Sequence, residues 1–144
     1  MSGNKIVLDS NIIIYLSKGL LRIEDISERY DDFYISIITY MEVMGYQFSD
    51  DRERQIIKEF FDNFEIIYIN SEIAENVILI RQQKKIKLPD AIILATAKFL
   101  NCPLMTRNVE DFQDILEEVD IVNPLEEPQT EVEEEEEISP TQTG

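Results

Sequence analysis

Short apolar runs alternate with longer segments of helical spacing, and this alternation constrains the fold more than any other feature of the chain. The runs are rich in Ile, Val, Leu and aromatic residues and occupy residues 5–8, 32–39, 65–69, 103–106 and 119–123. Because they are apolar at most positions, both faces of the resulting strands must be covered, as in parallel sheets. The chain is therefore predicted to be an α/β three-layer sandwich, with helices flanking a central, mainly parallel sheet of four to five strands.

The segments between these runs predict the helices. The most regular are 51–64, 72–86 and 88–101, and shorter ones are expected at 12–18, 20–30, 40–49 and 109–116. Gly19 is expected to end the first helix, and Ser71 is expected to cap the helix that follows it. The last apolar run is expected at the edge of the sheet.

Charge divides the chain into two parts. The 144 residues, 44% of them hydrophobic, suit one domain with a buried core, which we place at residues 1–123. Residues 117–144 hold 11 acids and no base, which leaves 13 bases against 19 acids in residues 1–116. Residues 124–144 are therefore predicted to be an acidic, disordered tail. This tail could simply solvate the domain, or it could fold over a binding site as a mimic of nucleic acid.

The absence of histidine excludes several classes of enzyme. A chain with no His has no Ser-His-Asp or Cys-His nucleophile and no His-ligated zinc. Its single cysteine, Cys102, cannot form an internal disulfide. A hydrolase of this composition must use carboxylates, which commonly act by holding a hard cation such as Mg²⁺ or Mn²⁺. No long apolar segment or signal peptide is visible, so a soluble, cytoplasmic protein is expected, with no membrane partner.

Acidic side chains from separate segments are predicted to meet at one edge of the sheet. Ligands of parallel sheets bind beyond the carboxyl ends of the strands. Asp9 ends the first strand, Asp90 begins the helix at 88–101, and Glu42 lies in the helix after the second strand. The segment after the fourth strand adds the polar side chains of Thr106, Asn108 and Asp111. Each acid also has an ordinary explanation, because Asp9, Asp90 and Asp111 could serve only as helix caps or first-turn acids.

Four blocks of the sequence resemble the motifs of PIN-domain proteins, and especially the VapC-type toxin ribonucleases of bacterial toxin–antitoxin pairs. They are KIVLDSNIIIYL, ISIITYMEVMGY, KLPDAIILATAKFL and PLMTRNVEDF, in this order from Lys5 to Phe112. The resemblance implies a PIN-like sandwich and an endoribonuclease that depends on Mg²⁺ or Mn²⁺. It also implies a homodimer and a small antitoxin partner.

The resemblance implies that the metal-binding and catalytic acids are Asp9, Glu42 and Asp90. Many relatives have an acid two residues after the Thr, whereas this chain has Asn108, so Asp111 could supply the fourth catalytic carboxylate. Ser10 and Thr106 are expected to support these acids through their hydroxyl groups, with Asn108 lending an amide oxygen.

The RNA substrate would be bound by few basic side chains. Lys84, Lys85 and Lys87 precede Asp90, and Arg107 follows the fourth strand. These cations could bind phosphate, or the lysines could simply complement the negative end of a helix.

Two other readings of the sequence stay open. The chain could be a non-catalytic PIN-fold module that acts through protein partners. It could also be a phosphatase of the haloacid dehalogenase type, although Asn11 stands where that class has its second acid.

Overall fold

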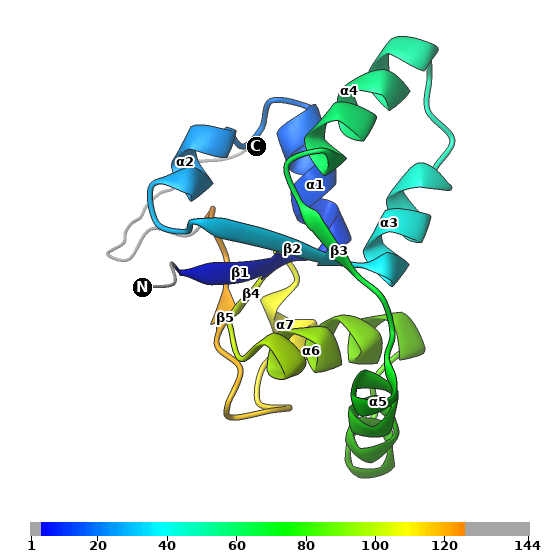
Figure 1. Cartoon of the computed structure of the whole chain (residues 1–144), viewed down its shortest axis with the longest axis vertical. Helices are drawn as coiled ribbons and strands as arrows, with labels where there is room; N and C mark the ends of the chain where they lie inside the picture. Colours follow the sequence, from blue (N-terminus) through cyan, green and yellow to red (C-terminus); the bar gives the residue numbers. More distant parts are fainter. Residues whose placement is uncertain (1–3, 126–144) are drawn as a thin grey trace, which may run out of the picture.

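Five parallel strands separate two layers of helices in the computed structural model (Figure 1), which describes residues 4–125. The strands are β1 (Lys5–Leu8), β2 (Asp32–Ser36), β3 (Glu65–Ile67), β4 (Leu104–Met105) and β5 (Ile121–Val122). They follow the order β3-β2-β1-β4-β5, and each neighbouring pair is parallel. The predicted three-layer α/β fold, with its last strand at an edge, is confirmed.

Seven helices connect the strands in the described part of the chain. They are α1 (Ser10–Ser17), α2 (Ile23–Ser27), α3 (Ile37–Met44), α4 (Asp51–Phe61), α5 (Ser71–Gln83), α6 (Leu88–Leu100) and α7 (Val109–Phe112). Figure 1 shows α1, α2, α3 and α4 on one side of the sheet, with α5, α6 and α7 on the other.

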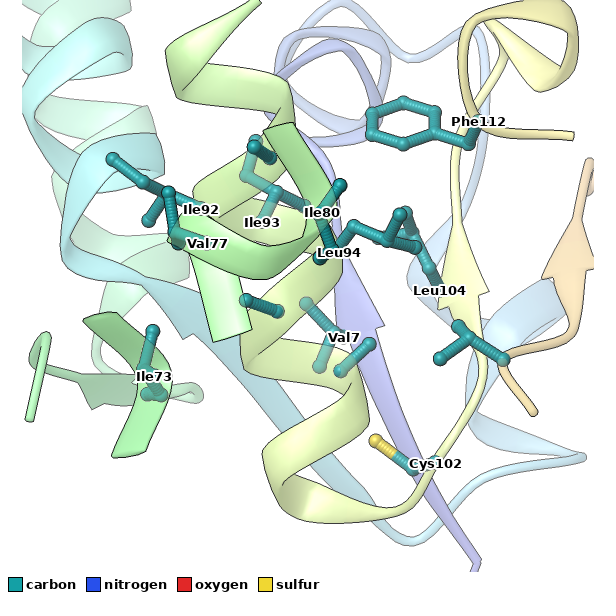
Figure 2. Close-up of a cluster of buried hydrophobic side chains, with 14 residues drawn as sticks. Val7, Ile73, Val77, Ile80, Ile92, Ile93, Leu94, Cys102, Leu104 and Phe112 are labelled. Atoms are coloured by element: carbon teal, nitrogen blue, oxygen red, sulfur yellow. The ribbon is translucent and has the colours of Figure 1, made fainter. Parts of the chain in front are cut away.

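The sheet has a hydrophobic core on each face because its strands alternate their apolar side chains between the two layers. In β1, Ile6 and Leu8 belong to the core under α1, whereas Val7 belongs to the core under α5 and α6. All three side chains are fully buried. Figure 2 shows the second core, in which Val7 and Leu104 of the strands meet the buried face of α6. This two-sided burial explains why the strand sequences are continuously apolar.

Several predicted boundaries are wrong, and side-chain capping explains two of them. The strand predicted at 32–39 ends at Ser36, because the Ser36 hydroxyl accepts a hydrogen bond from the backbone N–H of Ile38 and begins α3. Asn70, not Ser71, caps α5: its side-chain oxygen accepts from the N–H of Ile73 at 2.8 Å. The helix predicted at 20–30 is shorter, as α2, and the helix predicted at 40–49 begins and ends earlier, as α3.

The described residues, 4–125, cover most of the predicted domain at 1–123, and nearly all of the predicted acidic tail lies outside them. Only Pro124 and Leu125 of residues 124–144 are described. Within residues 4–125, no helix is both long and apolar enough to cross a membrane.

Candidate functional site

The strand order reverses between β1 and β4, and this reversal places the candidate site. From β1 the chain builds outward to β2 and β3 on one side, and then returns to add β4 and β5 on the other. The connections after β1 and β4 therefore leave in opposite directions and open a crevice at the carboxyl ends of these strands, where open α/β sheets bind ligands. Asp9 follows β1 directly, and Thr106 follows β4.

Asp9 is buried at this crevice, with only 5% of its surface exposed, and both of its carboxylate oxygens are engaged. One oxygen, Oδ1, accepts from the backbone N–H of Ser10 at 2.7 Å and caps α1, with the Ser10 hydroxyl at 3.4 Å. The other, Oδ2, accepts from the Thr106 hydroxyl at 2.7 Å. Burial raises the pKa of Asp9 above 3.8, although these hydrogen bonds oppose the shift. Asp9 can therefore cap α1 through one oxygen and still be a candidate metal ligand through the other.

Asn11 ties the two strand ends together, a role that the sequence reading missed. Its amide nitrogen lies 3.4 Å from Asp9 Oδ2 and 3.5 Å from Thr106 Oγ1. Its amide oxygen accepts from the backbone N–H of Arg107 at 3.2 Å. The only signal in the sequence is its place two residues after Asp9, where the phosphatase class has its second acid.

Asp90 lies in the first turn of α6, directly after Pro89. Its side chain is half-buried, and burial is the largest cause of its raised pKa. The negative charges of Asp9 and Asp111 raise the pKa further, and Lys87 lowers it. Asp90 therefore lies within electrostatic range of Asp9 and Asp111.

Glu42 comes from α3, which packs against α6. Glu42 is exposed on the solvent side of this helix, whereas its neighbour Val43 is buried. Even so, partial desolvation raises the pKa of Glu42, and the charges of Asp9 and Asp90 add to the shift. A contact with Ser10 opposes it. Glu42 therefore lies within electrostatic range of both acids.

Asn108 and Asp111 are the two candidates for the fourth ligand, beside Asp9, Glu42 and Asp90. The backbone N–H of Asn108 donates to Thr106 Oγ1 at 3.0 Å, which positions the loop between β4 and α7. Asp111 follows in α7, is exposed, and carries the charge that raises the pKa of both Asp9 and Asp90. Asp111 therefore lies within electrostatic range of Asp9 and Asp90.

The donor chemistry of this acidic group suits a hard divalent cation. Its members offer only carboxylate, hydroxyl and amide oxygens, and their mutual repulsion would be relieved by a positive ion. Within residues 4–125, however, no three acidic or cysteine side chains are arranged closely enough to hold a metal ion. Closing such a site therefore requires these side chains to turn toward one another; Asp90 is half-buried and Glu42 is exposed.

A cleft of about 690 Å³ contains two of the candidate acids, Asp90 and Asp111, beside lysines predicted to bind RNA, whereas Asp9 and Glu42 do not line it. Its charged lining consists of Arg81, Lys84, Lys85, Lys87, Asp90, Glu110, Asp111 and Asp114. Lys84, Lys85 and Lys87 therefore lie in the same cleft as Asp90 and Asp111. Arg107 is not part of this lining, since its guanidinium group donates a hydrogen bond to the Tyr15 hydroxyl.

The comparisons with known proteins show the family of the chain. Residues 6–134 match the family model of the PIN domain. The chain is 34% identical over 120 residues to Ribonuclease VapC1 of Methanocaldococcus jannaschii, covering 79% of this chain and 83% of that relative. A toxin-antitoxin complex from Klebsiella pneumoniae contains a similar chain with a TM-score of 0.65 and 36% identity, covering 83% of this chain and 97% of that one. For VapBC-1 from nontypeable Haemophilus influenzae, the TM-score is 0.66 and the identity 28%, with coverage of 83% and 98%. The chain therefore belongs to the PIN-domain family and, within it, to the VapC-type ribonucleases.

Proposed function

We propose that this protein is a divalent-metal-dependent endoribonuclease that hydrolyses RNA phosphodiester bonds as the toxin of a type II toxin–antitoxin pair. The observation that carries the proposal is the acidic group of Asp9, Glu42 and Asp90 at the switch point of the sheet, beside a cleft lined with lysines. Relatives named as ribonucleases and as toxin–antitoxin complexes support it.

The cofactor would be Mg²⁺ or Mn²⁺, held by Asp9, Glu42 and Asp90, with Asp111 as a further carboxylate. When bound, the ion would supply a water of lowered pKa and neutralise charge on the phosphate. The protein's own part is orientation. Thr106 and the cap of α1 hold the Asp9 carboxylate in one direction, so little entropy is lost when it binds a cation.

The RNA would approach along the cleft. Lys84 and Lys85 line it at the end of α5, and Lys87 lies three residues before Asp90. All three side chains are exposed and positively charged, as phosphate contacts require. In a strongly acidic chain these cations would offset local repulsion of the RNA backbone.

The partners would be an antitoxin and a second copy of the chain. Solved relatives described as VapBC and toxin–antitoxin complexes support the antitoxin. Exposed apolar side chains such as Met41 and Tyr46, 53% and 55% exposed, offer surface for a protein partner. We place the protein in the cytoplasm, where such a toxin would meet RNA.

Neither alternative reading is favoured by the site. A phosphatase of the haloacid dehalogenase type is not supported, because Asn11 holds Asp9 and Thr106 through hydrogen bonds instead of supplying a second acid. A non-catalytic module has no need for three carboxylates whose charges oppose one another.

Replacement of Asp90 tests the proposal. Asp90→Asn should lower cleavage of total cellular RNA in Mg²⁺ or Mn²⁺ by about 100-fold or more, because even a residue that only orients a metal ligand changes metal affinity by about 10–100-fold. Glu75→Gln, an exposed acid of α5, is the matched control and should cleave at the wild-type rate. An Asp90→Asn protein as active as the wild type would rule the proposal out.

A further inference from the structure

We propose that Tyr15, in the helical layer opposite the lysine-lined cleft, is a positioning residue for Arg107. Arg107 would then bind phosphate as a second basic contact, in addition to the lysines. An RNA strand would then cross the carboxyl ends of β1 and β4, with the acidic group between two basic contacts. This inference rests on the proposed function, since it names how the same site binds its RNA.

The Arg107 side chain is fixed by one aromatic residue. Its guanidinium carbon lies 4.8 Å from the centre of the Tyr15 ring, and its Nη1 donates a hydrogen bond to the Tyr15 hydroxyl. Cation–π contact and hydrogen bond together restrict an otherwise flexible side chain. A guanidinium group has five N–H donors, so most of them stay available for phosphate oxygens.

Tyr15 is itself anchored to the protein core. It is half-buried and packs against the cluster that contains Ile12, Ile13 and Leu16 of α1. Asn11 lies one turn earlier on the same helix and accepts from the backbone N–H of Arg107. Helix α1 therefore holds both the backbone and the side chain of Arg107, and through Asn11 it also contacts Asp9.

Tyr15, which holds Arg107, and the lysines belong to helical layers on opposite sides of the sheet. Tyr15 belongs to α1, in the layer above the sheet in Figure 1, whereas Lys84, Lys85 and Lys87 connect α5 to α6 in the layer below. Asp9 stands between these layers, at the end of β1. A strand of RNA that contacts both groups would cross the carboxyl end of β1, which Asp9 follows directly.

Nothing in the described part of the chain neutralises Arg107. It is exposed, and among residues 4–125 no carboxylate lies within ion-pair distance of its guanidinium group. An arginine with a purely structural role in an acidic protein would be expected to pair with an acid. A restrained, exposed and unpaired guanidinium suits an anionic ligand, here the phosphodiester of single-stranded RNA.

RNA binding measured against salt concentration tests the proposal. Fluorescence anisotropy of a single-stranded RNA oligonucleotide, with EDTA and an Asp90→Asn background that prevents cleavage, gives the dependence of log K on log salt. Each phosphate contact in single strands contributes about 0.7 to this slope. Arg107→Gln should therefore lower the slope by about 0.7, and so should Lys84→Gln, with additive loss in the double variant. Arg29→Gln is the control, because Arg29 lies at the amino-terminal edge of the sheet, beside Asn4.

Tyr15 is tested separately by Tyr15→Phe, which keeps the ring and its packing and removes only the hydroxyl. We expect weaker RNA binding with the salt slope unchanged, because Arg107 keeps its charge but loses its orientation. With otherwise wild-type protein, KM should rise more than kcat falls. Arg107→Lys should keep the slope and bind more weakly than the wild type, because a lysine cannot use the same forked geometry.

The outcomes separate this inference from the proposed function. If Lys84→Gln lowers the salt slope and Arg107→Gln does not, Arg107 does not contact phosphate, and the nuclease proposal stands. If Tyr15→Phe binds RNA as tightly as the unmodified background, the positioning role of Tyr15 is wrong. If Asp90→Asn still cleaves RNA, the proposed function fails, and this inference fails with it.

Discussion

At the scale of single residues, Asp9 shows how a helix cap and a candidate metal ligand can be one side chain. Its Oδ1 caps α1, and its Oδ2 is aimed by the Thr106 hydroxyl toward the end of β4. Burial makes the negative charge costly, and the nearby acids add to that cost. Such a carboxylate is best explained by a cation that compensates it.

Thr106 should therefore control metal affinity through Asp9. Thr106→Val keeps the side-chain shape but removes the donor to Asp9 Oδ2. We expect Mn²⁺ affinity to fall by about 10–100-fold, the usual cost of losing a residue that orients a metal ligand. Thr106→Ser retains the hydroxyl and should recover most of the affinity. Equal affinity for the Val and Ser variants, measured by calorimetry, would contradict this role.

The three raised pKa values predict how the metal-free protein responds to pH. Burial and like charge raise the pKa of Asp9, Glu42 and Asp90 in the folded state. Each protonated carboxyl group therefore contributes to the free energy of unfolding. This contribution is fully present below the ordinary pKa values of 3.8 and 4.5, and it is lost as the pH rises through the raised pKa of the folded state. Asp90→Asn should therefore unfold at a higher temperature than the wild type at pH 7 in EDTA.

The same comparison at pH 3.5 is the control for that prediction. There Asp90 is largely protonated in both states, so the difference in melting temperature should disappear. Glu75→Gln also removes one negative charge, on α5, and should not raise the melting temperature at pH 7. An Asp90→Asn protein that is no more stable than the wild type at pH 7 would contradict the proposed repulsion.

At the scale of secondary-structure elements, capping decides where the helices begin. The sequence reading placed the α5 cap one residue late because Ser71 and Asn70 are both good capping residues, and composition alone does not separate them. The strand at 32–39 was predicted too long for a related reason. Ile37 and Ile38 suit a strand, but Ser36 caps α3 and turns them into its first residues.

The capping correction has a direct test in the stability of the protein. Asn70→Ala removes the acceptor for the N–H of Ile73 and should lower the free energy of unfolding by about 1 kcal/mol. Ser71→Ala, one residue later and exposed in the first turn, should have little effect. Chemical denaturation of both variants measures the difference. A larger loss for Ser71→Ala would mean that the cap is misplaced.

At the scale of the whole molecule, the alternation of apolar runs and helices was enough to predict a covered parallel sheet. Strand order was not accessible in the same way, because the pairing of β1 with β4 joins residues nearly a hundred positions apart. Asp9 and Asp90 could be selected as candidates from their places at a strand end and a helix start, whereas the metal-binding roles of these acids and of Glu42 rest on the resemblance to PIN-domain motifs. Asn11 and Tyr15 could not be selected in this way, since their roles depend on the loop after β4, which only the folded chain brings to α1.

The central claim is that Asp9, Glu42 and Asp90 together bind one divalent cation. Calorimetric titration of the metal-free protein with Mn²⁺ tests it most directly, using Asp9→Asn, Glu42→Gln and Asp90→Asn beside the control Glu75→Gln. The account predicts saturable binding by the wild type and the control, and affinity lowered by about 10-fold or more in each of the three variants. Unchanged Mn²⁺ affinity in all three variants, or no binding by the wild type, would contradict it.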